Sequence, residues 1–312
     1  MANGILVIDK SAGWTSQDVA AKLRGVFHER RVGHGGTLDP MATGVLPVFI
    51  GRATRAAEFL ESAEKEYVAG LRLGVVTDTQ DTSGTVLETN PVCVTRAQLE
   101  AALRQFLGPI EQIPPMYSAI KINGQKLYEL ARRGQEVARR PRSITIHALE
   151  LLEGEGADWT IRVRCSKGTY VRTLCHDLGR ALGCGGCMSS LRRTRAGSFT
   201  LAQAVTMQQV LDFAAGQDPQ QLLNCLTKQD EMEITLSSVF AWARMMADTD
   251  TGNRQYQADA ASVMPLLDQP GAATAFIEPE LLALPEETLK SLPDALPGLA
   301  KYRFRLQELL RM

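Results

Sequence analysis

The 312-residue chain is 45% apolar and 22% charged, which excludes a disordered or collagen-like protein and allows two domains with a sizeable core. A net charge of −1 argues against a polyanionic partner, but this sum hides an uneven distribution of charge along the chain. Residues 1–224 hold 26 basic and 22 acidic side chains, whereas residues 225–312 hold 8 and 13. Residues 101–200 alone carry 16 basic against 8 acidic side chains, so a basic region precedes an acidic one.

Composition also restricts the compartment of the protein. No apolar run approaches the roughly 20 residues that cross a bilayer, and the opening MANGILVIDK has no signal-peptide pattern. The 6 cysteines are too few for a disulfide scaffold. We therefore expect a cytoplasmic protein with no membrane partner. Cys184-Gly-Gly-Cys187 has no second pair at ligand spacing, so a glycine turn is favoured over a zinc site.

The first 224 residues alternate strand and helix patterns joined by glycine turns. Four segments are predicted as strands: residues 4–9, 45–50, 67–76 and 159–165. Thr15 begins a predicted helix with a capping box, and Thr95 caps a second that is predicted to run to Gly108. Regular βαβ spacing and a Gly-rich dinucleotide loop are both missing from the sequence. These patterns predict an α/β (α+β) domain with a mixed, largely antiparallel sheet and flanking helices.

The pattern changes after about Leu222, where it becomes helical and is punctuated by prolines. Three stretches have apolar or amphipathic helix patterns: residues 234–247, the segment that begins at Pro285, and residues 299–310. Residues 225–312 also contain only three glycines. The sequence thus predicts an all-helical C-terminal segment over residues 225–312.

Residues 31–46, RVGHGGTLDPMATGVL, contain the most informative motif of the chain. Four glycines within this segment indicate unusual backbone angles or close approach to a ligand. Pro40 biases Asp39 towards an extended conformation, which places the carboxylate on a loop before the apolar run 45–50. Such a carboxylate is a candidate nucleophile or base, and an Asx turn is the alternative.

The segment around Asp39 resembles the catalytic signature of the tRNA pseudouridine synthase B family, G-x-L-D-P-x-A-x-G-V-L. Four further blocks match in the same order: residues 4–18; residues 65–67 with 73–74 and 77–84; residues 114–121 with Gly124, Tyr128, Ala131, Arg132 and Gly134; and residues 165–174 with 177–179, followed by 191–194. The resemblance implies the pseudouridine synthase fold over residues 1–224, with an RNA-contacting insertion at 115–142.

The resemblance also implies an activity and its catalytic residues. The family's isomerases convert the T-loop uridine at position 55 of tRNA to pseudouridine, and Asp39 matches the nucleophile. Whether it attacks the base or the sugar stays open. Arg172 matches the arginine that holds this aspartate ionised and aimed, and Tyr67 matches the tyrosine that stacks on the extruded base. No electron or group leaves in this isomerisation, so we expect neither a cofactor nor a metal.

The same comparison implies substrate-binding residues, for some of which ordinary structural roles are the alternative. His34 matches the histidine that enters the gap left by the flipped base, although a turn histidine would look alike. Leu191 matches an apolar residue of the base pocket, although a core leucine would too. Lys10 and Lys65 are expected as pocket or backbone contacts. The insertion supplies Tyr117, Lys121 and Arg132, and its basic residues interleaved with aromatics favour the T-arm of tRNA over a merely solvated face. We expect a monomer.

The segment after residue 225 departs from the family, whose members normally continue into a β-rich RNA-binding domain of the PUA type. Residues 233–312 instead resemble the N-terminal helical region of the oligoendopeptidase F family, in the runs 236–240, 247–251, 276–285 and 302–311. The HExxH motif of that peptidase is missing, because the last histidine is His176. The segment is interpreted as a fused or misassembled fragment, with an accessory helical domain as the alternative. Two other functions remain open: a tRNA-binding or RNA-folding protein without turnover, and a peptide-binding helical module.

Overall fold

The computed structural model of the chain describes residues 4–57, 60, 63–122 and 124–216. Within these residues, ten strands form one mixed sheet. They are β1 (Gly4–Lys10), β2 (Val32–His34), β3 (Thr43–Ile50), β4 (Lys65–Leu73), β7 (Gly108–Gln112), β10 (Arg142–Glu155), β11 (Asp158–Cys165), β12 (Gly186–Ala196), β13 (Phe199–Thr200) and β14 (Val205–Thr206). The predicted helical tail at 225–312 lies outside the described residues.

The sheet runs in the order β14-β1-β3-β12-β4-β11-β10-β7, with β2 beside β3 and β13 beside β12. Only β1–β14 and β3–β12 are parallel pairs among the described strands, so the predicted mixed, largely antiparallel sheet is confirmed. The β3–β12 junction is short: Arg192 pairs with Thr43 and Arg193 with Gly44. This junction brings the strand that follows the Asp39 loop against β12.

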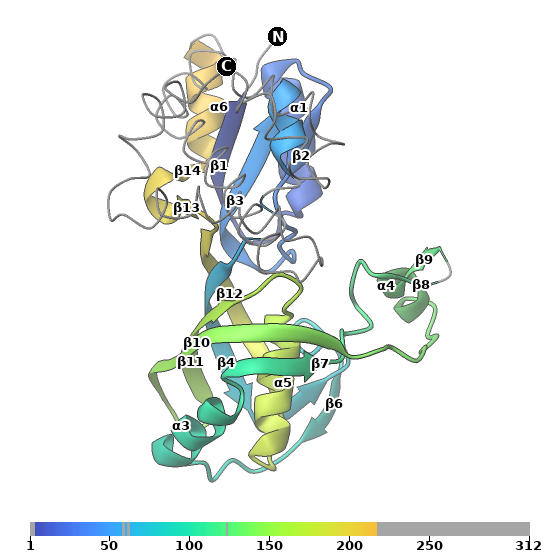
Figure 1. Cartoon of the computed structure of the whole chain (residues 1–312), viewed down its shortest axis with the longest axis vertical. Coiled ribbons are helices and arrows are strands. Elements are labelled where there is room, and N and C mark those ends of the chain that lie inside the picture. Colours follow the sequence, from blue (N-terminus) through green and yellow to red (C-terminus); the bar gives the residue numbers. More distant parts are fainter. Residues whose placement is uncertain (1–3, 58–59, 61–62, 123, 217–312) are drawn as a thin grey trace, which may run out of the picture.

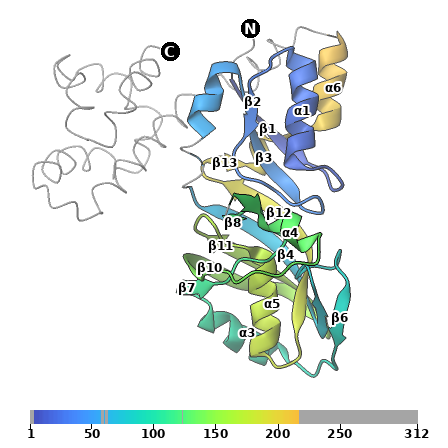
Figure 2. The same cartoon turned by 90° about the vertical axis from the view of Figure 1, so that its right-hand side faces the viewer.

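Two pairs of α-helices cover one face of the sheet, as Figures 1 and 2 show. α1 (Ser16–Phe27) and α6 (Met207–Gly216) lie side by side next to β1 and β2, while α3 (Arg96–Gln105) and α5 (Val171–Ala181) lie against β10, β4 and β12. Short 3-10 helices cover Gly51–Ala56 and Leu201–Gln203. A single apolar cluster extends from Leu23 of α1 to Leu174 of α5, so both helix groups share one core.

Local sequence signals account for the ends of several elements. The capping box of α1 is present, since Asp18 N donates to Thr15 Oγ1 at 3.0 Å and Thr15 N donates to Asp18 Oδ2 at 2.9 Å. The helix predicted from Thr95 to Gly108 ends earlier, at Gln105, because Gly108 has a φ of 86° and turns the chain into β7.

The strand predicted over residues 67–76 is two strands rather than one. Gly74, with a φ of 80°, separates β4 from β5 (Val75–Thr77), and β5 leaves the main sheet to pair with β6 (Val86–Thr89). A left-handed glycine reverses the local twist that a continuous strand requires, so the apolar pattern continues while the strand does not. The β5–β6 turn carries residues 77–84, which reach the site described below.

The segment between β7 and β10 projects from the sheet as a small unit, on the right in Figure 1. It contains β8 (Lys121–Ile122), β9 (Gln125–Lys126) and α4 (Leu127–Ala131). Met116, Leu127 and Leu130 form a separate apolar cluster that stabilises it. The unit begins and ends at one point of the sheet, where Gln112 of β7 pairs with Arg142 of β10.

Candidate active site

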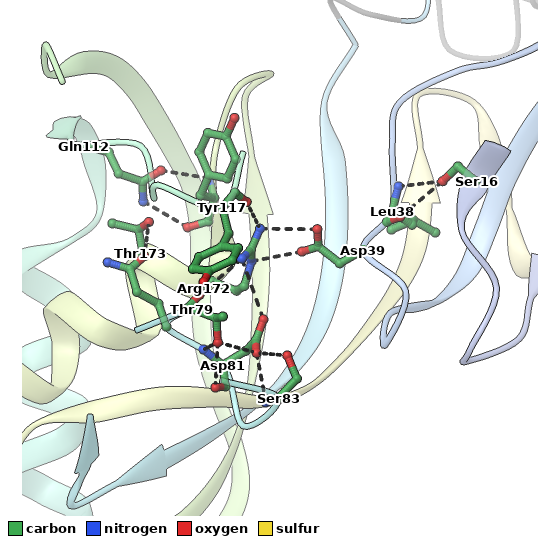
Figure 3. A network of polar contacts seen from close by, with 12 residues as sticks. Ser16, Leu38, Asp39, Thr79, Asp81, Ser83, Gln112, Tyr117, Arg172 and Thr173 are labelled. Atoms are coloured by element: carbon green, nitrogen blue, oxygen red, sulfur yellow. Dashed lines mark hydrogen bonds and ion pairs between the residues drawn. The ribbon is translucent and has the colours of Figure 1, made fainter. Parts of the chain in front are cut away.

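Asp39 lies on the loop between β2 and β3, as its Pro40 neighbour predicts. The loop is fixed on both sides of Asp39. Ser16 Oγ of α1 donates to the Leu38 carbonyl at 3.2 Å and accepts from Leu38 N at 2.9 Å (Figure 3), and the Pro40 carbonyl accepts from Gly13 N at 2.9 Å. The backbone around Asp39 is therefore held while its carboxylate points away from α1 towards α5.

Arg172 on α5 meets that carboxylate with two parallel contacts (Figure 3). Arg172 Nε lies 2.9 Å from Asp39 Oδ2, and Nη2 donates to Asp39 Oδ1 at 3.2 Å. The arginine side chain is 6% exposed and the aspartate side chain 34%, so a buried cation meets a carboxylate that faces solvent on one side. A bidentate pair fixes the orientation of the carboxylate as well as its charge.

Three further groups hold the guanidinium of Arg172 in place. Nη1 donates to the Thr79 carbonyl at 3.2 Å, and Nη2 donates to the Tyr117 carbonyl at 3.0 Å. Asp81 Oδ2 lies 3.7 Å from Nη1 and is itself held by Thr79 Oγ1 at 2.8 Å and by the backbone and hydroxyl of Ser83. The arginine is thus positioned by the β5–β6 turn and by the base of the insertion.

Burial and charge act in opposite directions on Asp39 and on its neighbour Lys10. Burial raises the pKa of Asp39, and Asp81 adds to the rise, whereas Arg172 and Lys10 oppose it. Lys10 is fully buried in β1, where its ammonium donates to the carbonyls of Ser11, Trp14 and Pro40. Burial lowers the pKa of Lys10 to about 8. Lys10 therefore acts on the site through the loop backbone and through its charge.

Tyr67 lies on β4 directly opposite Arg193 of β12, and both side chains are buried. Arg193, 1% exposed, donates to the carbonyls of Val45 at 2.7 Å and Gly36 at 3.1 Å. These two carbonyls lie on either side of Asp39 in the chain. Burial raises the pKa of the Tyr67 phenol, while the charge of Arg193 and a hydrogen bond from it act against the rise. Arg193 therefore connects the loop to the tyrosine.

The other predicted pocket residues are buried or half-buried in the main sheet. His34 is at the end of β2, its buried Nδ1 has no hydrogen-bond partner within the described residues, and burial lowers its pKa. Leu191 is 8% exposed within the core cluster. Lys65 is buried at the start of β4, and its ammonium donates to the Ala63 carbonyl at 2.7 Å, while its predicted contact with the substrate stays a prediction.

The insertion residues divide into two groups. The Tyr117 carbonyl reaches Arg172 and belongs to the site itself. Lys121 is exposed on β8, and Arg132 lies just after α4 with its guanidinium 5.4 Å from the ring centre of Tyr128. Lys126 lies 5.3 Å from the same ring. Cations beside a half-buried aromatic ring form a surface suited to stacking and to phosphate contacts.

Two residues that contact the site have no role in the sequence-based prediction: Asp81 and Arg193. Asp81 and Arg193 lie within matched motif blocks, but only their contacts in the fold distinguish them from neighbours.

Among the described residues, no three His, Cys, Asp or Glu side chains gather where a metal ion could be held. Gly185, between Cys184 and Cys187, has a φ of 75°, in agreement with the predicted turn. No helix in the described ranges is both long and apolar enough to span a membrane.

Comparison with known proteins decides the family. Residues 24–171 match the TruB family pseudouridylate synthase (N terminal domain), and residues 172–232 match the tRNA pseudouridylate synthase B C-terminal domain. The tRNA pseudouridine synthase B of Stutzerimonas stutzeri (strain A1501) is 52% identical over 206 residues, which cover 66% of this chain and 68% of that protein. The chain belongs to the TruB family. The family's relative from Azoarcus sp. (strain BH72) is 49% identical over 208 residues, 67% of this chain and 69% of its own.

Solved structures support the pseudouridine synthase fold. A Cbf5-Nop10-Gar1 complex contains a chain with a TM-score of 0.54 and 36% identity, covering 67% of this chain and 54% of that one. A chain of the archaeal box H/ACA sRNP Nop10-Cbf5 complex has a TM-score of 0.55 and 30% identity, covering 77% and 67%. As a TruB family member, the chain is a pseudouridine synthase, an isomerase that acts on uridine in RNA. The resemblance of residues 233–312 to the oligoendopeptidase F family stays a prediction.

Proposed function

We propose that the chain isomerises a uridine in the T loop of tRNA to pseudouridine, with Asp39 as the nucleophile. The bidentate contact between Asp39 and the buried Arg172 carries this proposal, because it presents an oriented carboxylate at an open side of the loop. The enzyme would act in the cytoplasm as a monomer on tRNA. The isomerisation itself needs no redox cofactor and no metal.

The chemistry requires that the N-glycosidic bond breaks, the base turns, and the sugar C1′ joins the C5 carbon of the base, which then loses a proton. Asp39 supplies an electron pair for the step that detaches the base, and Arg172 stabilises and aims its charged form against the effect of burial. Tyr67 offers a flat face to the extruded base and a hydroxyl close to Arg193. The freed N1 of the base gains a proton as C5 loses one, and the bond that Asp39 forms breaks again, so the product is an isomer of the uridine and Asp39 is regenerated.

Recognition of the tRNA rests on the insertion and on the loop. Lys121, Arg132 and Tyr117 contact the T-arm, His34 occupies the place of the flipped base, and Leu191 lines the base pocket in this proposal. Lys10 and Lys65 support the pocket through the backbone carbonyls they bind. Residues 1–224 form the catalytic unit, and residues 225–312 form a separate segment in place of the usual final RNA-binding domain.

The substitution Asp39→Asn tests the proposal, because it removes the nucleophile and nearly preserves shape. We expect the rate of pseudouridine formation in unmodified tRNA to fall on the order of 10⁴-fold, which is the size of loss that follows removal of one catalytic side chain. The Kd for tRNA should stay within about twofold of the wild-type value. Asp158→Asn is the matched control, since Asp158 is exposed and pairs with Arg72 at 2.7 Å on the sheet. An active Asp39→Asn enzyme would exclude Asp39 as nucleophile. Wild-type protein that leaves unmodified tRNA unchanged would refute the proposed function.

A further inference from the structure

Gln112, the last residue of β7, makes two side-chain hydrogen bonds to a single backbone residue (Figure 3). Tyr170 N donates to Gln112 Oε1 at 2.8 Å, and Gln112 Nε2 donates to the Tyr170 carbonyl at 3.1 Å. Gln112 is 2% exposed, so these bonds form away from solvent. The amide thus satisfies both polar groups of one peptide residue, as a neighbouring strand would.

Tyr170 is the residue from which α5 begins. It occupies the N-cap position of that helix, and its own side chain makes no capping hydrogen bond in the described structure. The Gln112 amide is therefore the side chain that fixes the start of α5 against the sheet. Arg172 lies two residues further along the chain, on the first turn of the same helix.

The position of that first turn decides where the guanidinium points. Arg172 makes its two contacts with Asp39 at 2.9 and 3.2 Å, and both depend on the plane of the guanidinium. A displacement of about 1 Å in a catalytic group is enough to cost a large factor in rate. A residue that fixes the start of α5 therefore also fixes the Asp39–Arg172 pair.

Gln112 also marks the point at which the insertion leaves the sheet. It pairs with Arg142, and these two residues are the last pair of the β7–β10 ladder before the insertion. The insertion contacts α5 a second time, because the Tyr117 carbonyl accepts from Arg172 Nη2 at 3.0 Å. The base of the insertion is thus joined to two neighbouring positions of the helix start.

We propose that Gln112 is a positioning residue for the reaction: it ties the start of α5 to the base of the RNA-contacting insertion and thereby aims Arg172 at Asp39. Alignment of the nucleophile then depends on a buried amide at the base of the insertion, while affinity for RNA depends on the exposed side chains of the insertion. The inference rests on the proposed function. A purely structural Gln112 would contribute to folding stability alone.

The pH dependence of turnover separates these two roles. The charged groups that face Asp39 are Arg172 from α5, Asp81 from the β5–β6 turn and Lys10 from β1, and only Arg172 is attached to the helix that Gln112 fixes. Loosening Arg172 removes part of the effect that opposes burial, so the pKa of Asp39 rises further. The acid limb of the kcat profile must then move to higher pH.

The experiment compares Gln112→Met with Gln98→Met in the full chain. Gln98 is a matched control, because its side chain also bonds the backbone at a helix start: Thr95 N donates to Gln98 Oε1 at 2.8 Å, on α3. For Gln112→Met we expect kcat for tRNA to fall at least about tenfold, with KM and the tRNA Kd within about twofold, and the acid limb to move upward. For Gln98→Met we expect a lower Tm with unchanged kcat and pH profile.

Two results would overturn the inference: a Gln112→Met enzyme whose kcat and pH profile match those of Gln98→Met, or one in which only KM rises. If Gln112→Met does not fold, Gln112→Asn keeps the amide on a shorter side chain, and the same comparison of kcat and pH profile applies to it. Failure of the inference is distinct from failure of the proposed function. In the first case wild-type protein makes pseudouridine and the Gln112 variants behave as the control, whereas in the second the wild-type protein makes none.

Discussion

Two opposing effects set the charge of Asp39. Burial disfavours the carboxylate, and the nearby Asp81 acts in the same direction, while the Arg172 guanidinium stabilises the ionised form. Arg172 is shared, since it lies 2.9 Å from Asp39 and 3.7 Å from Asp81. One cation between two carboxylates thus orients Asp39, the proposed nucleophile, while it also contacts Asp81.

Replacing Asp81 by asparagine tests this sharing. Loss of the Asp81 charge lowers the pKa of Asp39, because a like charge that raised it is gone. We therefore expect the acid limb of kcat to move to lower pH in Asp81→Asn. The guanidinium also loses one of the groups that hold it in place. We expect the resulting misalignment of Arg172 to raise the activation free energy by about 1.4 kcal/mol, which lowers the maximal kcat about tenfold.

Ser83→Ala is the control for Asp81→Asn. Ser83 donates to Asp81 from its backbone and its hydroxyl, so the alanine variant removes one hydrogen bond and leaves the charge in place. Its acid limb should stay close to that of the wild type. An Asp81→Asn profile that shifts to higher pH would show that alignment of Arg172, rather than the charge of Asp81, governs the ionisation of Asp39.

The parallel contact between β3 and β12 brings two backbones close together near the site. Gly44, with a φ of 98°, lies opposite Arg193, and a Cβ at this glycine would come within 2.2 Å of the Arg193 carbonyl oxygen. No side chain fits there without moving β12. The motif glycine is thus required by the strand junction that positions both Arg193 and the Asp39 loop.

The substitution Gly44→Ala should therefore destabilise the fold. We expect a loss of about 3 kcal/mol in the free energy of unfolding measured in urea, from the left-handed backbone together with the steric overlap. Gly13→Ala is the matched control: Gly13 has a φ of 84°, but a Cβ there meets no atom within 4 Å. Its cost should be only the backbone term of about 1–2 kcal/mol. If Gly44→Ala and Gly13→Ala lost the same free energy of unfolding, the β3–β12 junction would accommodate the added methyl group without a steric cost.

At the scale of the molecule, charge is separated along the chain. Residues 101–200 hold 16 basic and 8 acidic side chains, and this basic excess is offset by acidic excesses in the rest of the chain, the largest of them the 8 basic against 13 acidic side chains of residues 225–312. Part of the basic excess lies on the insertion, which projects from the sheet (Figure 1). In the proposed function, this projecting basic unit contacts RNA phosphates while the Asp39 loop stays within the body of the protein.

Salt dependence of tRNA binding measures this arrangement. We expect the affinity to fall steeply with ionic strength, and Arg132→Ala to reduce the slope of log K against log salt by about one phosphate contact. Arg96→Ala is the control, because Arg96 lies on α3, paired with Glu100 at 2.9 Å. If Arg132→Ala and Arg96→Ala had the same slope of log K against log salt, Arg132 would not contact an RNA phosphate.

The sequence by itself determined the local structure and the chemical groups of this protein. Pro40 places Asp39 on a loop, Thr15 and Asp18 cap α1, and alternating apolar residues define β11, all through interactions within a few residues. The resemblance of the motif blocks also supplied Arg172 as a partner, although the two residues are 133 positions apart.

Tertiary structure decided which further groups act on that pair. Asp81, Arg193 and Gln112 receive their roles from contacts with backbone carbonyls and with charges on distant segments, such as the 58 positions between Gln112 and Tyr170. Every residue offers the same peptide groups, so a side chain that bonds a distant peptide produces no pattern in the sequence. Only the folded sheet, which brings β7, β12 and the β5–β6 turn around α5 and the loop, selects these residues.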